Sequence, residues 1–174
     1  MGLHSTLFYT FSTISQTGAG MIALLGAFVL YKLQFLNREL DELSTGLIDS
    51  LRKSPTGWDD RIFGEFRQHH LRGEFSEVVK KSLGLNVAPG TKKHAKPVQD
   101  RMAQLVKDKN DMVRLFKCAG ALVAASIILS VCGLPFVEFT ADHIKLSMLQ
   151  LFLVCGPFIL GTIESVRLVY KACD

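Results

Sequence analysis

Residues 1–31 contain no lysine, arginine, aspartate or glutamate. A secretory signal peptide needs a basic start and a small-residue cleavage site, and this segment has an uncharged start followed by Tyr31-Lys32-Leu33. We therefore expect the segment to be retained. An uncharged helix of about 20 residues spans the hydrocarbon core of a bilayer, so this absence of charge predicts a membrane-spanning N-terminal helix.

The chain also lacks the motifs that carry common chemistry. It has no nucleotide-binding glycine loop, no His-Glu-x-x-His motif and no nucleophile elbow. Its four cysteines stand at no metal or redox spacing, and Glu65 with His69 falls short of the three or four ligands that zinc needs. No basic-aromatic nucleic-acid module is present. We therefore expect no enzymatic activity, no cofactor, no metal and no nucleic-acid partner.

Charge is instead concentrated in the middle of the chain. Seventeen of the 20 Lys and Arg residues lie between Lys32 and Lys117, beside 12 acidic residues. Two further uncharged segments follow, Cys118–Val137 and Leu146–Ile163. Because Lys and Arg accumulate in short cytoplasmic segments, this pattern predicts an outside N-terminus and a cytoplasmic C-terminus in a bacterial inner membrane.

The sequence predicts an all-α integral membrane protein with three transmembrane helices. The first and second of these helices extend into a cytoplasmic antiparallel helical stalk, which short helices cap. The expected segments are a short outside N-terminus (1–11), a first span (12–35), the stalk and cap (36–117), a second span (118–137), an outer hairpin loop (138–145), a third span (146–165) and a cytoplasmic tail (166–174).

Apolar and small residues repeat at spacings of three and four along the predicted stalk and first span, which is typical of helices that pack lengthwise. In the stalk this seam comprises Leu33, Leu36, Leu40, Leu43 and Leu47, with Met102 and Leu105 on the returning helix. In the first span the same face comprises Gln16, Ala19, Ala23 and Gly26. Pairing of the stalk seams within one chain or between chains stays open.

Residues 58–83 predict one or two short amphipathic helices interrupted near Gly73. Their apolar side chains could cap the stalk, lie on the membrane surface or contact a partner, and the candidate partner face comprises Trp58, Phe63 and Phe66. The next segment, Asn86–Pro97, contains Pro89-Gly90 and three lysines. It predicts an exposed loop.

Four residues of the third span recur at heptad-like spacing and share one face, a candidate pore or helix-packing face: Gln150, Pro157, Gly161 and Glu164. Pro157 has no N–H for the carbonyl of Leu153, which can then face a neighbour or water. An intramembrane carboxylate is a functional candidate. Glu164 either pairs with a basic residue such as Arg167 at the membrane surface or lines an ion route.

The order of spans, with an outside N-terminus, a long cytoplasmic segment and a tight outer hairpin, resembles the energising subunits of proton-driven stator complexes. That resemblance implies an ion-conducting function. Our first hypothesis is a non-enzymatic, self-assembling membrane protein that forms an ion-conducting or membrane-permeabilising pore controlled by its cytoplasmic cap. The alternative is an accessory or scaffold subunit that recruits a soluble cytoplasmic partner to the lipid bilayer.

Overall fold

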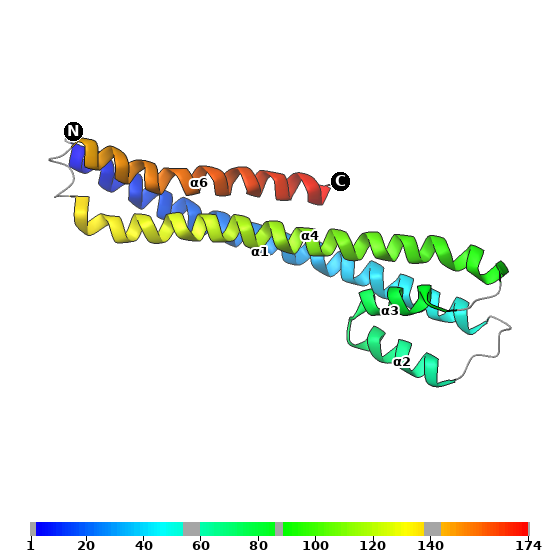
Figure 1. The fold of residues 1–174 in the computed structure, drawn as a ribbon. Coiled ribbons are helices and arrows are strands. Elements are labelled where there is room, and N and C mark those ends of the chain that lie inside the picture. The colour runs from blue at the N-terminus through cyan, green and yellow to red at the C-terminus, as the bar shows by residue number, and fades with distance from the viewer. Residues whose placement is uncertain (1–2, 54–59, 86–88, 138–143, 174) are drawn as a thin grey trace. The chain divides into compact units, whose positions relative to one another are not determined.

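The computed structural model describes residues 3–53, 60–85, 89–137 and 144–173, and this part of the chain is helical almost throughout and has no strand (Figure 1). The helices α1, α4 and α6 are each long and apolar enough to cross a membrane. The all-α class and the three candidate spans are therefore confirmed. In chain order the elements are α1 (Leu3–Arg52), α2 (Asp60–Leu71), α3 (Phe75–Leu83), α4 (Pro89–Gly133), the 3-10 helix η1 (Leu134–Phe136) and α6 (Ile144–Cys173).

The chain divides into two compact units. We call residues 1–30 with 112–174 the span unit, and residues 31–111 the hairpin unit. Helices α1 and α4 each contribute to both units. The span unit contains the uncharged segments, and the hairpin unit contains most of the basic residues.

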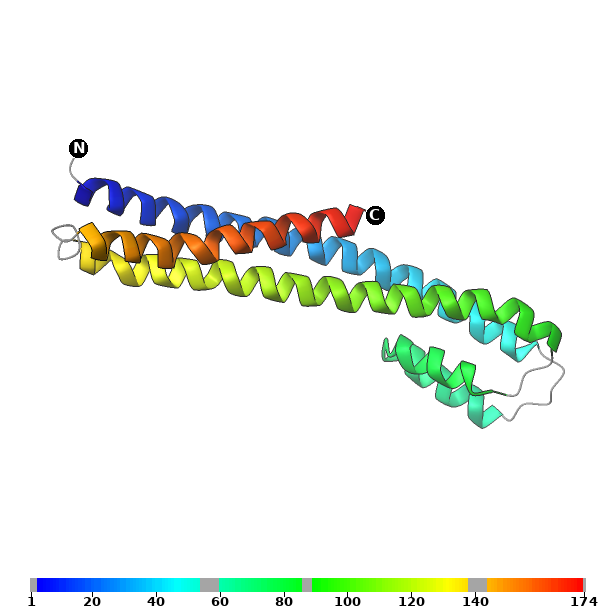
Figure 2. The ribbon, with the colours of Figure 1, turned by 45° about the horizontal axis from the view of Figure 1, so that its top comes forward.

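In the span unit, α1 and α6 run in one direction and α4 runs in the other (Figure 2). The core near the start of α1 is a buried apolar cluster of Leu7, Phe11, Ile14, Val137 and Val154. Residues 3–11 were expected to form a short segment before the first span. They are helical, and two of them belong to this core, so the apolar helix begins earlier than residue 12.

Two glycines allow the helices of the span unit to approach closely. A methyl group added at Gly161 of α6 would lie 2.7 Å from Val123 Cγ2 on α4. A methyl group at Gly18 of α1 would lie 3.0 Å from Ile127 Cγ1, also on α4. Small residues at such positions let membrane helices pack backbone to backbone, where van der Waals contact is a main source of stability.

In the hairpin unit, α1 and α4 lie side by side and antiparallel. Arg101 on α4 forms a 2.9 Å ion pair with Glu39 on α1. Lys109 Nζ donates a 2.7 Å hydrogen bond to Asn37 Oδ1. The stalk seams therefore pair within one chain. Most of the seam is buried, namely Leu36, Leu40, Leu47, Met102 and Leu105, while Leu33 and Leu43 are half-buried.

The two short helices α2 and α3 meet at Gly73, whose φ of 69° lies in the left-handed region. The backbone N–H of Glu74 donates to the carbonyl of His69, and that of Gly73 donates to the carbonyl of His70. This is a Schellman motif, which favours glycine because a side chain is strained at positive φ. The predicted interruption of the cap helices near Gly73 is confirmed.

The expected loop over Asn86–Pro97 is wrong from residue 89 onward, because α4 begins at Pro89 and continues through Pro97. Residues 86–88 lie outside the described residues. Proline is well suited to the first turn of a helix, since the N–H that it lacks has no partner there. Pro97 is tolerated further inside because Ala95 and Gln99 are buried, so packing offsets the lost hydrogen bond.

Candidate functional site

One face of α1 in the span unit is exposed and consists mainly of polar and small side chains, with Leu24 as one large apolar side chain among them. We call it the α1 polar face, and its members Thr13, Gln16, Thr17, Gly20, Ala23 and Ala27 are all exposed. Spacings of three and four residues place them on one side of the helix. The opposite side carries buried Phe11, Ile14, Gly18 and Leu25.

The other two helices of the span unit expose a different kind of surface. Large apolar side chains are exposed along α4 and α6, for example Ile128 at 61 % and Phe152 at 77 %. Along α1 between Tyr9 and Leu30, a stretch that the structure describes completely, Leu24 is the one exposed large apolar side chain. Lipid tails suit the surfaces of α4 and α6, whereas the α1 polar face presents hydrogen-bonding groups that lipid cannot satisfy.

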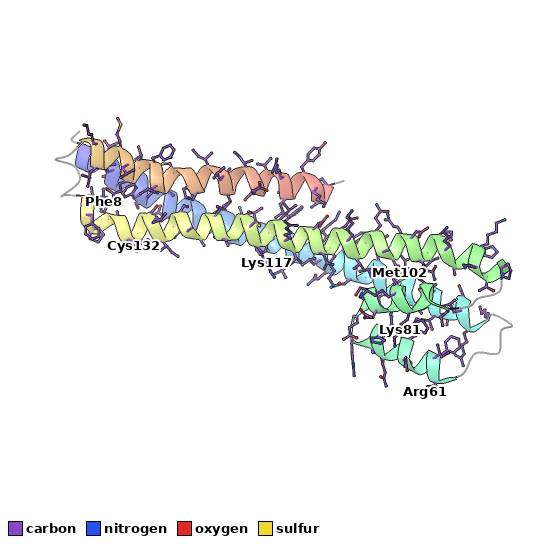
Figure 3. The ribbon with its side chains drawn as sticks, in the orientation of Figure 1. Phe8, Arg61, Lys81, Met102, Lys117 and Cys132 are labelled. Atoms are coloured by element: carbon purple, nitrogen blue, oxygen red, sulfur yellow. The ribbon has the colours of Figure 1, made fainter. Side chains whose placement is uncertain are left out.

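Contacts between α1 and α4 show which part of α4 lies alongside Gln16. Phe11 lies beside Gly133 at one end of α4, and Gly26 lies beside Phe116 nearer the other end. These contacts set the stretch from Phe11 to Gly26 alongside the predicted second span, and Gln16 falls between them. Figure 3 labels Phe8 of α1 and Cys132 of α4 at the same end of the span unit. Inside a bilayer, an exposed amide such as that of Gln16 requires a hydrogen-bonding partner.

Three of the four predicted packing residues of the first span are exposed, and the fourth is half-buried. Gln16, Ala19 and Ala23 are exposed, so any packing through them involves a surface outside this chain. Gly26 is half-buried, and a methyl group there would lie 3.8 Å from Phe116. Assembly through Gln16, Ala19 and Ala23 remains a prediction.

The predicted face of the third span packs largely against α4 of its own chain. Gln150 Nε2 donates a 3.1 Å hydrogen bond to the carbonyl oxygen of Gly133. Gly161 lies against Val123. Pro157 is half-buried inside the continuous helix α6. The structure thus uses Gln150 and Gly161 for packing within the chain.

Glu164, the carboxylate of that face, is paired with a nearby arginine. Arg167 Nη1 donates to Glu164 Oε1 at 2.9 Å, one turn further along α6. The Glu164 side chain is 25 % exposed and that of Arg167 is 69 % exposed. This arrangement matches the interfacial pair that the sequence offered as one of two roles for Glu164.

Of the candidate partner residues on the cap, Phe66 is buried and Phe63 is half-buried. Phe66 is 1 % exposed, so it packs inside the hairpin unit and offers no surface to a partner. Phe63 is half-buried at the edge of a groove between α1 and α2. Trp58 lies outside the described residues.

The residues that suggested a metal site have other partners. Glu65 Oε2 accepts a 2.7 Å hydrogen bond from Lys81 Nζ, and the pKa of Glu65 is held below its ordinary value chiefly by that hydrogen bond and charge. His69 Nδ1 lies 2.6 Å from Glu74 Oε2. Among the described residues, no three His, Cys, Asp or Glu side chains converge.

The span unit has four serine hydroxyls in its interior, two with and two without a hydrogen-bond partner among the described residues. Ser126 and Ser165 donate to carbonyls of their own helices, at 3.0 Å and 2.7 Å respectively. Ser15 Oγ and Ser130 Oγ are buried without a hydrogen-bond partner among the described residues. A buried hydroxyl without a partner is costly.

No protein-family model, curated protein or solved structure matches this chain. Sequence reasoning found Gln16 but missed Thr13, Thr17, Gly20 and Ala27. The missed residues form a row of polar and small side chains on the side of α1 opposite Phe11 and Ile14. The sequence prediction followed mainly apolar spacing, which does not reveal such a row. Sequence reasoning also missed Gly18, because a single glycine forms no recognisable motif.

Proposed function

We propose that the protein is a non-enzymatic helical membrane protein that assembles with copies of itself through the α1 polar face. The assembly encloses a path for water and ions, lined by the side chains of Thr13, Gln16 and Thr17. By the positive-inside rule we place the hairpin unit in the cytoplasm and the N-terminus outside. The observation that carries the proposal is the contrast between the exposed α1 polar face and the apolar surfaces of α4 and α6.

Self-assembly is supported by the chemistry of that face. Leaving an amide such as Gln16 unpaired in hydrocarbon costs roughly several kcal/mol, so a neighbouring helix or water must satisfy it. Gly20, Ala23 and Ala27 present no large side chain, so a second helix can approach at these positions and pack around Leu24. The large exposed side chains of α4 and α6 then remain in contact with lipid.

A conducting path is supported by the hydroxyl and amide groups on the same face. Side-chain oxygens can replace part of the hydration shell of an ion, whereas an all-apolar interface would exclude water. The sequence suggested the α6 face as a pore lining. This is less well supported, because Gln150 and Glu164 form interactions within the chain. The α1 polar face therefore takes its place as the candidate lining.

Assembly is tested by the mass of the purified protein in native membrane nanodiscs. We expect a closed homo-oligomer that Gly20→Leu disrupts, because a leucine there blocks the approach of a second helix. A methyl group at Gly20 meets no atom of its own chain within 4 Å. Gly120→Leu is the matched control, since a methyl group at Gly120 on α4 also meets none. A monomer, or equal effects of the two variants, would reject the proposal.

Conduction is tested separately by reconstituting the oligomer in planar bilayers. The double variant Thr13→Val with Thr17→Val keeps side-chain volume and removes two hydroxyls from the proposed lining. We expect it to assemble and to carry a reduced current. An oligomer that carries no current in the native form would leave assembly standing and favour the alternative role, a scaffold for a soluble partner.

A further inference from the structure

The hairpin unit contains a groove of about 630 Å³ between α1 and α2, lined by residues that the structure describes. On α1 the groove follows Thr45, Ile48, Asp49 and Arg52, and on α2 it follows Phe63, Gly64, Arg67, His70 and Leu71. Both sets recur at helical spacing. The groove is therefore about two turns, or about 10 Å, long between two antiparallel helices.

One end of the groove is fixed by His70. Its Nδ1 lies 3.0 Å from Ser44 Oγ, and its Nε2 lies 3.3 Å from Asp41 Oδ1. Both partners are on α1, and Ser44 is fully buried. Since both ring nitrogens of His70 are engaged, this residue holds α2 against α1 and defines the width of the groove.

The walls combine an apolar floor with positive charge. Ile48 and Phe63 are half-buried, and Leu71 at the rim is 74 % exposed. Arg52 and Arg67 are exposed and form no ion pair with any acidic side chain that the structure describes. Among the described residues that line the groove, Asp49 is the one acidic residue. The groove thus offers two guanidinium groups beside exposed apolar surface.

Gly64 leaves the middle of the α2 wall open. A methyl group added there meets no atom within 4 Å, so the α2 backbone itself faces the groove. A glycine inside a helix costs up to about 1 kcal/mol relative to alanine. A partner that packs against the bare backbone at Gly64 provides a reason for glycine at this position despite its cost to helix stability.

We propose that this groove binds an acidic amphipathic helix of a soluble protein. Helix-in-groove recognition uses apolar side chains at helical spacing that enter a groove between helices. Carboxylates at the edge of such a helix match Arg52 and Arg67, because guanidinium groups bind carboxylates in a bidentate manner. This inference goes beyond the proposed function: it concerns the hairpin unit alone and does not depend on assembly through α1.

The test places a photo-cross-linking amino acid at Leu71 in the full-length protein in its native membrane. Mass spectrometry then identifies the attached peptide. Leu83 on α3 is the matched control, since it is 61 % exposed and does not line the groove. We expect an acidic, amphipathic segment of a soluble protein to be attached at Leu71 and not at Leu83. Attachment of lipid or of a second copy, or no attachment, would overturn the proposal.

A second variant pair tests whether the groove itself is the site. Gly64→Phe fills the groove, and Gly46→Phe adds the same side chain to an open position of α1 that does not line it. We expect cross-linking from Leu71 to be lost in Gly64→Phe and kept in Gly46→Phe. Cross-linking that persists in Gly64→Phe would reject the groove as the binding site.

The charge component is measured with the identified segment as a synthetic peptide and the full chain in nanodiscs. Arg52→Gln and Arg67→Gln should each weaken binding by about tenfold or more, because each removes a charge-assisted hydrogen bond. Exchange of the peptide's glutamates for glutamines should weaken it similarly. Affinity that is unchanged in all of these variants would contradict recognition of an acidic helix.

Discussion

Gln150 Nε2 on α6 donates a 3.1 Å hydrogen bond to the backbone carbonyl oxygen of Gly133 on α4. Gly133 is the last residue of α4, where helix carbonyls lose their partners within the helix. The absence of a side chain at Gly133 makes room for this contact, since a methyl group there would lie 2.6 Å from Gln150 Nε2. A glutamine in a predicted membrane span thus serves to hold the second and third spans together.

Removal of this hydrogen bond should weaken the span unit. Gln150→Leu is expected to lower the free energy of unfolding by about 1 kcal/mol, the usual scale for a hydrogen bond between membrane helices. Unfolding in mixed detergent micelles measures the change. Gln104→Leu, an exposed position on α4 in the hairpin unit, controls for loss of an amide. Equal effects of the two variants would show that the bond to Gly133 contributes nothing.

Gly161→Ala should be more damaging than the size of a methyl group suggests. The added carbon would lie 2.7 Å from Val123 Cγ2 and 3.2 Å from the backbone nitrogen of Val123, so α4 or α6 must shift. Overpacking of this kind costs about 1–3 kcal/mol.

The control for this prediction is Gly120→Ala, where the added methyl group meets no atom within 4 Å. Alanine is the better helix former, so this variant should be neutral or more stable by up to about 1 kcal/mol. The free energies of unfolding of both variants, measured in mixed micelles, give the comparison. If Gly161→Ala is as stable as Gly120→Ala, the close approach of α6 to Val123 is wrong.

Gly73→Ala should loosen the α2–α3 pair. Gly73 has a φ of 69°, and an L-residue in that conformation costs about 1–2 kcal/mol. Amide hydrogen exchange in α2 and α3 should accelerate accordingly. Gly84→Ala is the control, because Gly84 ends α3 with a φ of −76° and tolerates a side chain. Equal exchange in the two variants would contradict the positive φ at Gly73.

The ion pair between Glu65 and Lys81 should make the packing of α2 on α3 sensitive to acid. Lys81 lowers the pKa of Glu65 in the folded chain through a hydrogen bond and its charge. Because the folded pKa lies below the unfolded one, the stabilisation is present above about pH 4.5 and is lost as the pH falls through the lower folded value.

NMR titration of the Glu65 carboxyl group measures this effect. Lys81→Met should return the pKa of Glu65 toward its ordinary value, because both main causes of the shift are removed. Lys80→Met is the control: it removes the 2.7 Å partner of Glu77 on the same helix, so it should raise the pKa of Glu77 and leave that of Glu65 nearly unchanged. An unchanged pKa of Glu65 in Lys81→Met would contradict the pair.

Local pattern was enough to predict several parts of the fold. The heptad spacing of Leu36, Leu40 and Leu47 predicted a buried seam, and those residues are buried. Gly73 predicted a break between two cap helices because a turn at positive φ favours glycine. These features depend on neighbours in sequence, which is why residue spacing reveals them.

Other features depend on contacts between distant segments. Pro97 suggested a loop, yet it lies inside α4 between the buried residues Ala95 and Gln99, whereas Pro89 fits the first turn of the helix by a local rule. A methyl group at Gly120 would meet no atom within 4 Å, whereas Gly18 and Gly161 make the close approaches. Which glycine meets another helix is set by how the helices are rotated against one another.

The sequence by itself determined the helical class, the three apolar segments and the break near Gly73, because hydropathy, charge and glycine act locally along the chain. Only the tertiary structure decided which faces are used. It turned Gln150 toward Gly133 and left Gln16 exposed, although both are glutamines in apolar segments. The physical reason is that burial of a side chain depends on the helix packed against it, and residue spacing alone does not specify that partner.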